Sequence, residues 1–249
     1  MSPSVNSKTT GVALVLIVIV GISGLALAPY FGPQPSADSV TIHLLLTEGL
    51  MIEYNNSRLY IDPWYLLDNY TDFLADVILI THPHFDHYNE SVVSMLQKET
   101  TVNVLPSNMS DEVTLHDGIG VVPGDVIQVG DFTITAFYQY SPGHPREANW
   151  TSYLVDINGF TIFHAGDSMN ITEYEQLNGL VDLAFLPVYN YDETTVYSIE
   201  MIQPHYYVPI HFDEGYNQIY VNAYGDEIAA VSDCEILVMD YWSSYTFEI

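Results

Sequence analysis

The stretch that decides the fold is Thr81-His82-Pro83-His84-Phe85-Asp86-His87, which carries three imidazoles and a carboxylate. The apolar run Val77-Ile78-Leu79-Ile80 comes directly before it and predicts a buried strand. Open α/β sheets place their site residues where a strand leaves the sheet. In an extended loop His82 and His84 point the same way, whereas Asp86 and His87 turn elsewhere. The loop therefore predicts ligands for two adjacent ions, with an ordinary polar surface as the alternative.

The charge of the chain limits its partners. The formal charge is −28, from 32 acidic residues and only four Lys and Arg. This imbalance excludes nucleic acid and anionic lipid head groups as favoured partners. It is typical of salt adaptation or of a generally acidic solvated surface. The single cysteine, Cys234, excludes an intrachain disulfide.

The N-terminal region predicts export. Residues 11–28 contain no charge and follow Lys8, which is typical of a signal peptide or of an uncleaved membrane anchor, with a buried core helix as a third interpretation. The next basic residue is Arg58, so the bulk of the chain is expected outside the membrane. We expect a signal or anchor at residues 1–28, a Pro- and Gly-rich linker at 29–39 and one folded domain at 40–249.

The rest of the chain is rich in strands, with helices between them. Apolar runs bounded by turn residues predict strands at 41–46, 50–54, 58–61, 77–80, 101–105, within 121–136, and at 153–157, 160–164, 183–186, 206–210 and 235–239. Helices are expected near 91–98, from a capping box of Thr172 and Glu175 to Gly179, and near 218–232.

Further ligand-type residues follow other predicted strands. His144 lies in a Pro- and Gly-rich loop, Asp167 follows the run that ends at His164, and His211 follows the strand 206–210. Each histidine alone is as well explained by a capped or core imidazole. Their common position past strand ends indicates a single site.

On these motifs the chain resembles the metallo-β-lactamase fold superfamily. The resemblance rests on Thr81 to His87, His144, Gly166-Asp167 and His211. The Ile61-Asp62-Pro63 step and the surroundings of His164 are most similar to the lactonase-like branch that includes L-ascorbate-6-phosphate lactonase. The resemblance implies an α/β fold, a four-layer αββα sandwich, over roughly residue 40 to the C-terminus.

The resemblance also implies two divalent metal ions, zinc or manganese rather than iron, because position 84 is His where di-iron relatives carry Glu. It implies one ion on His82, His84 and His144 and a second on Asp86, His87 and His211, with Asp167 bridging. Two further residues, Asp62 and His164, are expected to orient the ligands or to serve the fold alone.

The expected function is hydrolysis of a small ester, lactone or phosphodiester by a hydroxide that bridges the metals, with Asp86 handling its proton. Arg146 and Asn190 are candidate substrate contacts, although a surface role explains Arg146 equally well and packing explains Asn190 better. The alternative is a non-catalytic extracellular binding module that retains the fold. The sequence does not determine the oligomeric state.

Overall fold

The computed structural model describes residues 39–188 and 191–249, which form two seven-stranded sheets. The first sheet has the order β14-β1-β2-β3-β4-β5-β6. Its strands are β1 (Ser39–Leu44), β2 (Leu50–Tyr54), β3 (Ser57–Ile61), β4 (Val77–Leu79), β5 (Val102–Pro106), β6 (Ile119–Val121) and β14 (Ser244–Glu248).

The second sheet has the order β13-β12-β11-β10-β9-β8-β7. Its strands are β7 (Val126–Val129), β8 (Phe132–Tyr138), β9 (Thr151–Ile157), β10 (Phe160–His164), β11 (Leu183–Pro187), β12 (Tyr206–Ile210) and β13 (Glu235–Ile236). Both sheets are mixed, because each joins antiparallel strands to a parallel run.

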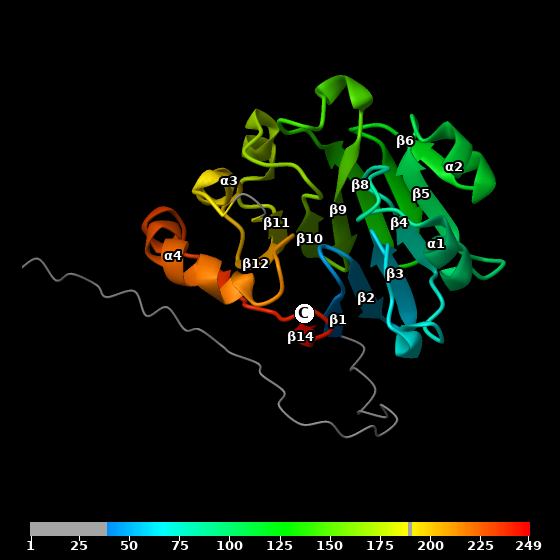
Figure 1. Cartoon of the computed structure of the whole chain (residues 1–249), viewed down its shortest axis with the longest axis horizontal. Coiled ribbons are helices and arrows are strands. Elements are labelled where there is room, and N and C mark those ends of the chain that lie inside the picture. Colours follow the sequence, from blue (N-terminus) through cyan, green and yellow to red (C-terminus); the bar gives the residue numbers. More distant parts are fainter. Residues whose placement is uncertain (1–38, 189–190) are drawn as a thin grey trace, which may run out of the picture.

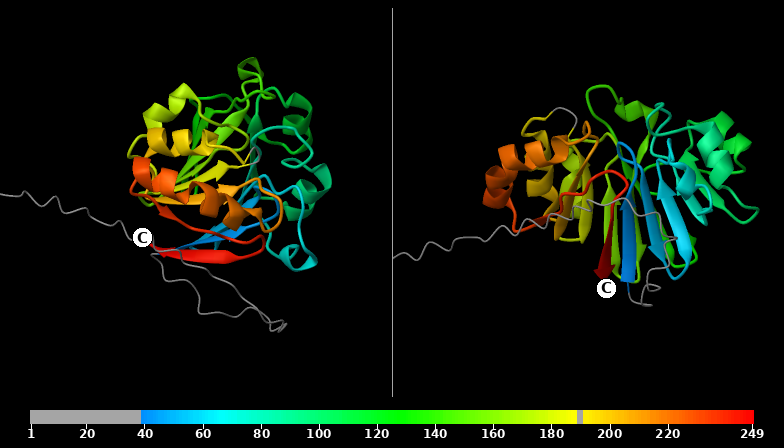
Figure 2. Two further views of the ribbon diagram at one scale, coloured as in Figure 1. Left: turned by 60° about the vertical axis from the view of Figure 1, so that its left-hand side comes forward. Right: turned by 60° about the horizontal axis from the view of Figure 1, so that its bottom comes forward.

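The helices lie outside the two sheets and complete a four-layer αββα sandwich. Helices α1 (Glu90–Leu96) and α2 (Ser110–Leu115) lie beside the first sheet, and α3 (Thr194–Ile202) and α4 (Tyr216–Val231) lie beside the second (Figure 1). Figure 2 shows these helices on opposite outer sides of the molecule, with the strands between them. Short 3₁₀ helices occupy Asp68–Tyr70, Arg146–Ala148 and Thr172–Leu177. The predicted fold class is confirmed.

The main core lies between the sheets because alternate strand residues point inward. In β8, Phe132, Ile134 and Ala136 are buried, whereas the threonines between them are partly exposed. The hydroxyl of Tyr153 on β9 donates to the carbonyl of Ile80, 2.8 Å away. This bond ties the second sheet to the residue just before the loop Thr81 to His87, which we call the metal loop.

Parallel pairing brings the site residues to one edge. Strands β3, β4, β5 and β6 run parallel, and so do β10, β11, β12 and β13. Their carboxyl ends deliver Asp62, the metal loop, Asp167 and His211 to one side of the sandwich. The turn between β1 and β2 reaches the same edge, because Leu50 pairs with Ile61.

Several local predictions were wrong. Thr172–Leu177 forms a 3₁₀ helix whose N-cap is Ile171 without a side-chain cap bond, so Thr172 and Glu175 form no capping box. The strand predicted at 235–239 ends at Ile236, and the last strand is β14, which pairs with β1 across the chain. Helices α2 and α3 were not predicted.

Within the described residues no helix is long and apolar enough to span a membrane. The predicted signal or anchor at 1–28 and nearly all of the 29–39 linker lie outside those residues.

Candidate metal centre

Four ligand-type side chains converge on one point, which is the first of two candidate metal positions. They are His82, His84, His144 and Asp167, each with one ligand atom within 4.8 Å of the others. Nε2 of His82 lies 3.0 Å from Nδ1 of His84, and that Nδ1 lies 3.2 Å from Nε2 of His144. His84 is the most exposed member of the group. The metal loop thus meets the loop after β8 at a single point.

These nitrogen distances match a tetrahedral ion site. Zinc–nitrogen bonds of about 2.0–2.1 Å place two ligand nitrogens of a tetrahedron roughly 3.3 Å apart. Hydrogen bonds cannot join all three rings, because Nδ1 of His84 has either one hydrogen or one lone pair and cannot serve both neighbours at once. Their lone pairs therefore face a common point, as metal ligands do.

A second group lies beside the first and comprises Glu48, Asp86, His87 and His211, again with ligand atoms within 4.8 Å. Oε1 of Glu48 lies 2.9 Å from Nε2 of His87. Nε2 of His211 lies 3.7 Å from both Oε2 of Glu48 and Oδ2 of Asp86. Glu48 was not predicted from the sequence. The sequence did hold a signal for this ligand. Glu48 is a lone acid between two apolar strand runs, at the sheet edge that also receives Asp62.

Asp167 joins the two positions. Its Oδ2 lies 2.9 Å from Nε2 of His144, and its Oδ1 lies 3.2 Å from Nε2 of His87 and 3.4 Å from Nε2 of His211. Each carboxylate oxygen thus faces a different group. The preceding Gly166 has φ +54°, and a Cβ there would come within 2.5 Å of Oε1 of Gln139. The turn that aims Asp167 therefore requires glycine.

Asp62 and Thr81 fix the orientation of two ligand rings. Its Oδ1 accepts the backbone N–H of Thr81 at 2.7 Å, and its Oδ2 accepts the Thr81 hydroxyl at 2.6 Å and Nδ1–H of His87 at 2.8 Å. Nδ1 of His82 lies 3.0 Å from the Thr81 hydroxyl oxygen and 2.9 Å from Nε2 of Gln139. Asp62 thus fixes the His87 ring with Nε2 toward the site, and Thr81 and Gln139 fix the His82 ring in the same way.

His164 positions the backbone around Glu48. Its Nδ1 accepts the N–H of Gly166 at 3.1 Å, so its Nε2 carries the proton and donates to the carbonyl of Glu48 at 2.8 Å. The ring is fully buried and does not belong to either ligand group. It links the loop that carries Asp167 to the turn that carries Glu48.

The electrostatics of the site fit cations. Burial lowers the pKa values of His82, His84 and His211, so these rings are neutral. Burial alone would also lower the pKa of His87, but its neighbours Glu48, Asp167 and Asp62 outweigh burial and raise it. Burial raises the pKa of Glu48. The neutral rings of His82, His84 and His211 are ready to bind divalent ions, whereas His87 and Glu48 would release a proton when an ion binds.

Buried polar atoms mark the second position. Both carboxylate oxygens of Glu48, Nε2 of His87 and Oδ1 of Asp167 are buried, and their close contacts are ion-pair contacts with the other ligands of this group rather than well-directed hydrogen bonds. Buried polar atoms that only face one another in this way are the arrangement that a bound cation satisfies. The donor set and these atoms together fit two metal ions.

Of the two candidate substrate contacts, Arg146 lies in the described residues and is held by an acid and two aromatic rings. The Arg146 guanidinium pairs with Glu173 and lies over the rings of Tyr138 and Tyr140, 5.3 and 5.0 Å from their centroids. A role in substrate contact would require it to leave Glu173. Asn190 lies outside the described residues.

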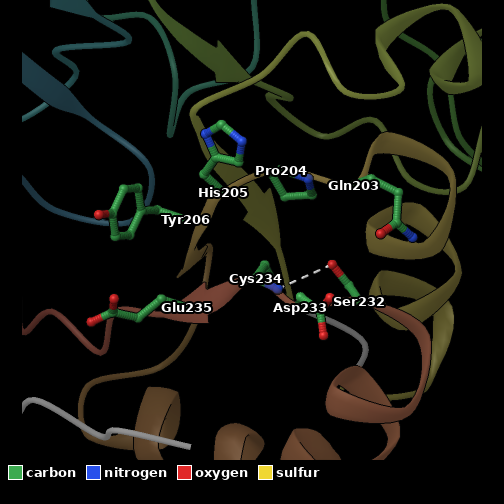
Figure 3. A pocket seen from close by; sticks show the side chains of 8 residues that line it. All are labelled: Gln203, Pro204, His205, Tyr206, Ser232, Asp233, Cys234 and Glu235. Atoms are coloured by element: carbon green, nitrogen blue, oxygen red, sulfur yellow. Dashed lines mark hydrogen bonds between the residues drawn. The ribbon is translucent and has the colours of Figure 1, made fainter. Parts of the chain in front are cut away.

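A pocket of about 290 Å³ lies at the other end of β12, between Pro204-His205-Tyr206 and Ser232 to Glu235 (Figure 3). Its His205 pairs with Asp182 at 3.0 Å, outside the pocket lining. Burial raises the pKa of Cys234, which disfavours a reactive thiolate. Within the described part of the chain this end gathers no group of metal-ligating side chains.

Comparison with known proteins agrees with this geometry. The family model of the β-lactamase superfamily domain matches residues 41–211. The chain belongs to the β-lactamase superfamily. It is 29% identical over 153 residues to a UPF0173 metal-dependent hydrolase of Thermococcus onnurineus, covering 56% of this chain and 67% of that protein. It is 26% identical over 190 residues to a UPF0173 metal-dependent hydrolase of Staphylococcus aureus, covering 66% and 82%.

The solved structures extend the comparison of this superfamily member. A metallo hydrolase from Ignicoccus hospitalis superposes with a TM-score of 0.69 at 19% identity, covering 85% of this chain and 99% of that one. The metallo-β-lactamase fold protein YhfI of Bacillus subtilis gives a TM-score of 0.64 at 14% identity, covering 84% and 100%. These likenesses establish the fold, and the predicted superfamily is confirmed. The lactonase-like branch stays a prediction.

Proposed function

We propose that this protein is a metal-dependent hydrolase that acts on a small uncharged ester or lactone. The observation that carries the proposal is the convergence of two ligand groups that share Asp167. Two similar proteins, from Thermococcus onnurineus and Staphylococcus aureus, are named as metal-dependent hydrolases and support the reaction class.

The chain's own residues divide the work. Two bound divalent ions, with zinc at the imidazole-rich position, would lower the pKa of a water between them and polarise the scissile bond. The two ligand groups and Asp167 hold the centre, and Asp62 and His164 orient it. Asp86 has a 23% exposed side chain, whereas Glu48 has none of its side chain exposed. Asp86 is therefore the carboxylate placed to take up a proton from the attacking water.

The charges of the chain favour an uncharged substrate. In the described residues each Lys and Arg side chain pairs with an acid: Arg58 with Glu53, Lys98 with Asp76 and Arg146 with Glu173. With a formal charge of −28, the surface repels anions. A phosphodiester would depend on the metals alone, whereas an ester or lactone needs no cationic partner.

Aromatic side chains at the rim of the centre favour a substrate with an apolar part. Phe85, between His84 and Asp86, is 79% exposed and meets Trp64 edge-on, with ring centroids 6.4 Å apart. Trp150 packs against His82 and His84, with centroids 5.2 Å from each. Such rings contribute about 0.5–1.5 kcal/mol per aromatic contact beyond the buried area. We propose that these rings contact the apolar group of the substrate.

The test is a matched substrate panel on the metal-loaded full-length protein. An aryl ester and an aryl lactone are expected to be hydrolysed faster than an aryl phosphodiester with the same leaving group. Phe85→Ala should raise KM for the aryl ester by about three- to ten-fold, with kcat nearly unchanged. Leu115→Ala, which truncates a 56% exposed residue of α2, is the control and should change neither. A metal-loaded protein without turnover on the whole panel would favour a non-catalytic binding module.

We also propose that the domain is exported, either membrane-anchored or secreted. The uncharged stretch 11–28 after Lys8 supports this location. Protease added to intact cells should cleave the domain or release it. Complete protection would contradict an exterior location.

A further inference from the structure

The two metal positions differ in the donors that surround them. The first has three imidazoles, from His82, His84 and His144, and one oxygen of Asp167. The second has two imidazoles, two carboxylates of its own and the other oxygen of Asp167. Four donors that are mostly nitrogen therefore stand beside five donors that are mostly oxygen.

Glu48 supplies the fifth donor of the second position, and the fold holds it in place. Its side chain is fully buried, and both of its oxygens make ion-pair contacts rather than well-directed hydrogen bonds. One oxygen lies 2.9 Å from Nε2 of His87. Its carbonyl accepts from His164, and the turn around it is closed by the bond from Leu45 N–H to the Gly49 carbonyl at 2.7 Å. The carboxylate has no solvent to turn toward and stays directed at the second position.

The donor chemistry favours different ions. Zinc prefers four-coordinate sites rich in nitrogen or sulfur, whereas carboxylate oxygens in larger number suit manganese and magnesium. Zinc binds most sites more tightly than manganese, so the expected difference is one of relative preference. The anionic carboxylates Glu48 and Asp86 also attract a hard cation more strongly than neutral rings do.

We propose that the two positions select different ions, zinc at the first and manganese at the second, and that Glu48 sets this difference. The inference rests on the metal centre of the proposed function, but not on its substrate. It makes the protein a mixed-metal enzyme in which Glu48, as the additional carboxylate, tips the second position toward manganese.

The test measures metal content rather than activity. Full-length protein stripped with a chelator is equilibrated in buffered zinc with a large excess of manganese and then analysed by elemental mass spectrometry. Wild type is expected to retain about one zinc and one manganese per chain, with a manganese electron paramagnetic resonance signal. Glu48→His should lower the bound manganese at least about ten-fold and raise zinc toward two.

The controls separate the possible failures. Glu53→Gln removes an acid of β2 that pairs with His43 and Arg58, and it should leave both metals unchanged. Glu48→Asp keeps the carboxylate and should restore manganese relative to Glu48→His, while circular dichroism checks that each variant is folded. Two zinc ions in wild type, or equal manganese in Glu48→His, would overturn the inference alone. Protein that binds neither ion would overturn the metal centre and hence the proposed function.

Discussion

The carboxyl ends of β3 and β4 and the amino ends of β10, β11 and β12 carry the same side-chain arrangement, but only the first makes a metal centre. At the metal end, Asp62 accepts from the N–H and hydroxyl of Thr81 and binds Nδ1 of His87. At the opposite end, Asp182 accepts from the N–H and hydroxyl of Thr161 and lies 3.0 Å from Nδ1 of His205. An Asp–Thr–His group is therefore not sufficient for a site.

The difference lies in what the second ring nitrogen meets. Nε2 of His87 is buried and faces Glu48 at 2.9 Å and Asp167 at 3.2 Å. The His205 side chain is 73% exposed. Water satisfies an exposed ring without cost, whereas a buried ring among carboxylates calls for a cation. Burial and convergence, rather than residue type, thus distinguish the two ends.

The largest expected effect comes from comparing two single variants that each remove one imidazole, His87→Ala and His205→Ala. His87→Ala should lower kcat/KM at least about a thousand-fold, because the metals supply several kcal/mol of transition-state stabilisation. It should also lower the bound metal by about one ion per chain, as elemental analysis would show. His205→Ala should change neither quantity. Equal losses in both variants would mean that His87 acts through the fold rather than through a metal.

A smaller effect is expected from the two aspartates. Asp62→Asn leaves the ligands in place but weakens the acceptor that holds Nδ1–H of His87, so metal affinity should fall about 10- to 100-fold. Asp182→Asn makes the same change at the other end and should leave metal affinity unaltered. Competition with a chelator of known affinity measures both. An Asp62→Asn protein with wild-type affinity would reduce Asp62 to a structural residue of the strand end.

The comparison also explains how far the sequence could be interpreted. The metal loop, His144, Asp167 and His211 were identifiable because ligand-type residues follow apolar strands, and the structure brings them together. Glu48 was missed because a lone acid in a short turn looks like a solvated residue until strand pairing shows that the turn is buried. Strand β14 was missed because its pairing with β1 joins residues about two hundred positions apart, which no local pattern reveals.

The smallest expected effect concerns the pH dependence of stability. Burial lowers the pKa of His164, so the folded protein keeps this ring neutral while the unfolded chain takes up a proton near pH 6.5. Its contribution to the free energy of unfolding is therefore present above that pH and is lost as pH falls. The same sign holds for His82 and His211, whereas the raised pKa of His87 acts in the opposite direction.

Metal-free protein should accordingly lose stability on acidification from pH 7 to pH 5, by up to about 1.4 kcal/mol per pH unit for each such neutral ring. His164→Gln keeps an N–H that can donate to the Glu48 carbonyl but removes one titrating ring, so its loss over this interval should be smaller than that of wild type. Urea unfolding in the presence of a chelator at both pH values measures the difference. An identical loss in the two proteins would show that His164 titrates in the folded state as it does in the unfolded chain. The ring would then contribute packing and a hydrogen bond to the turn of Glu48, but no part of the acid sensitivity of this end of the molecule.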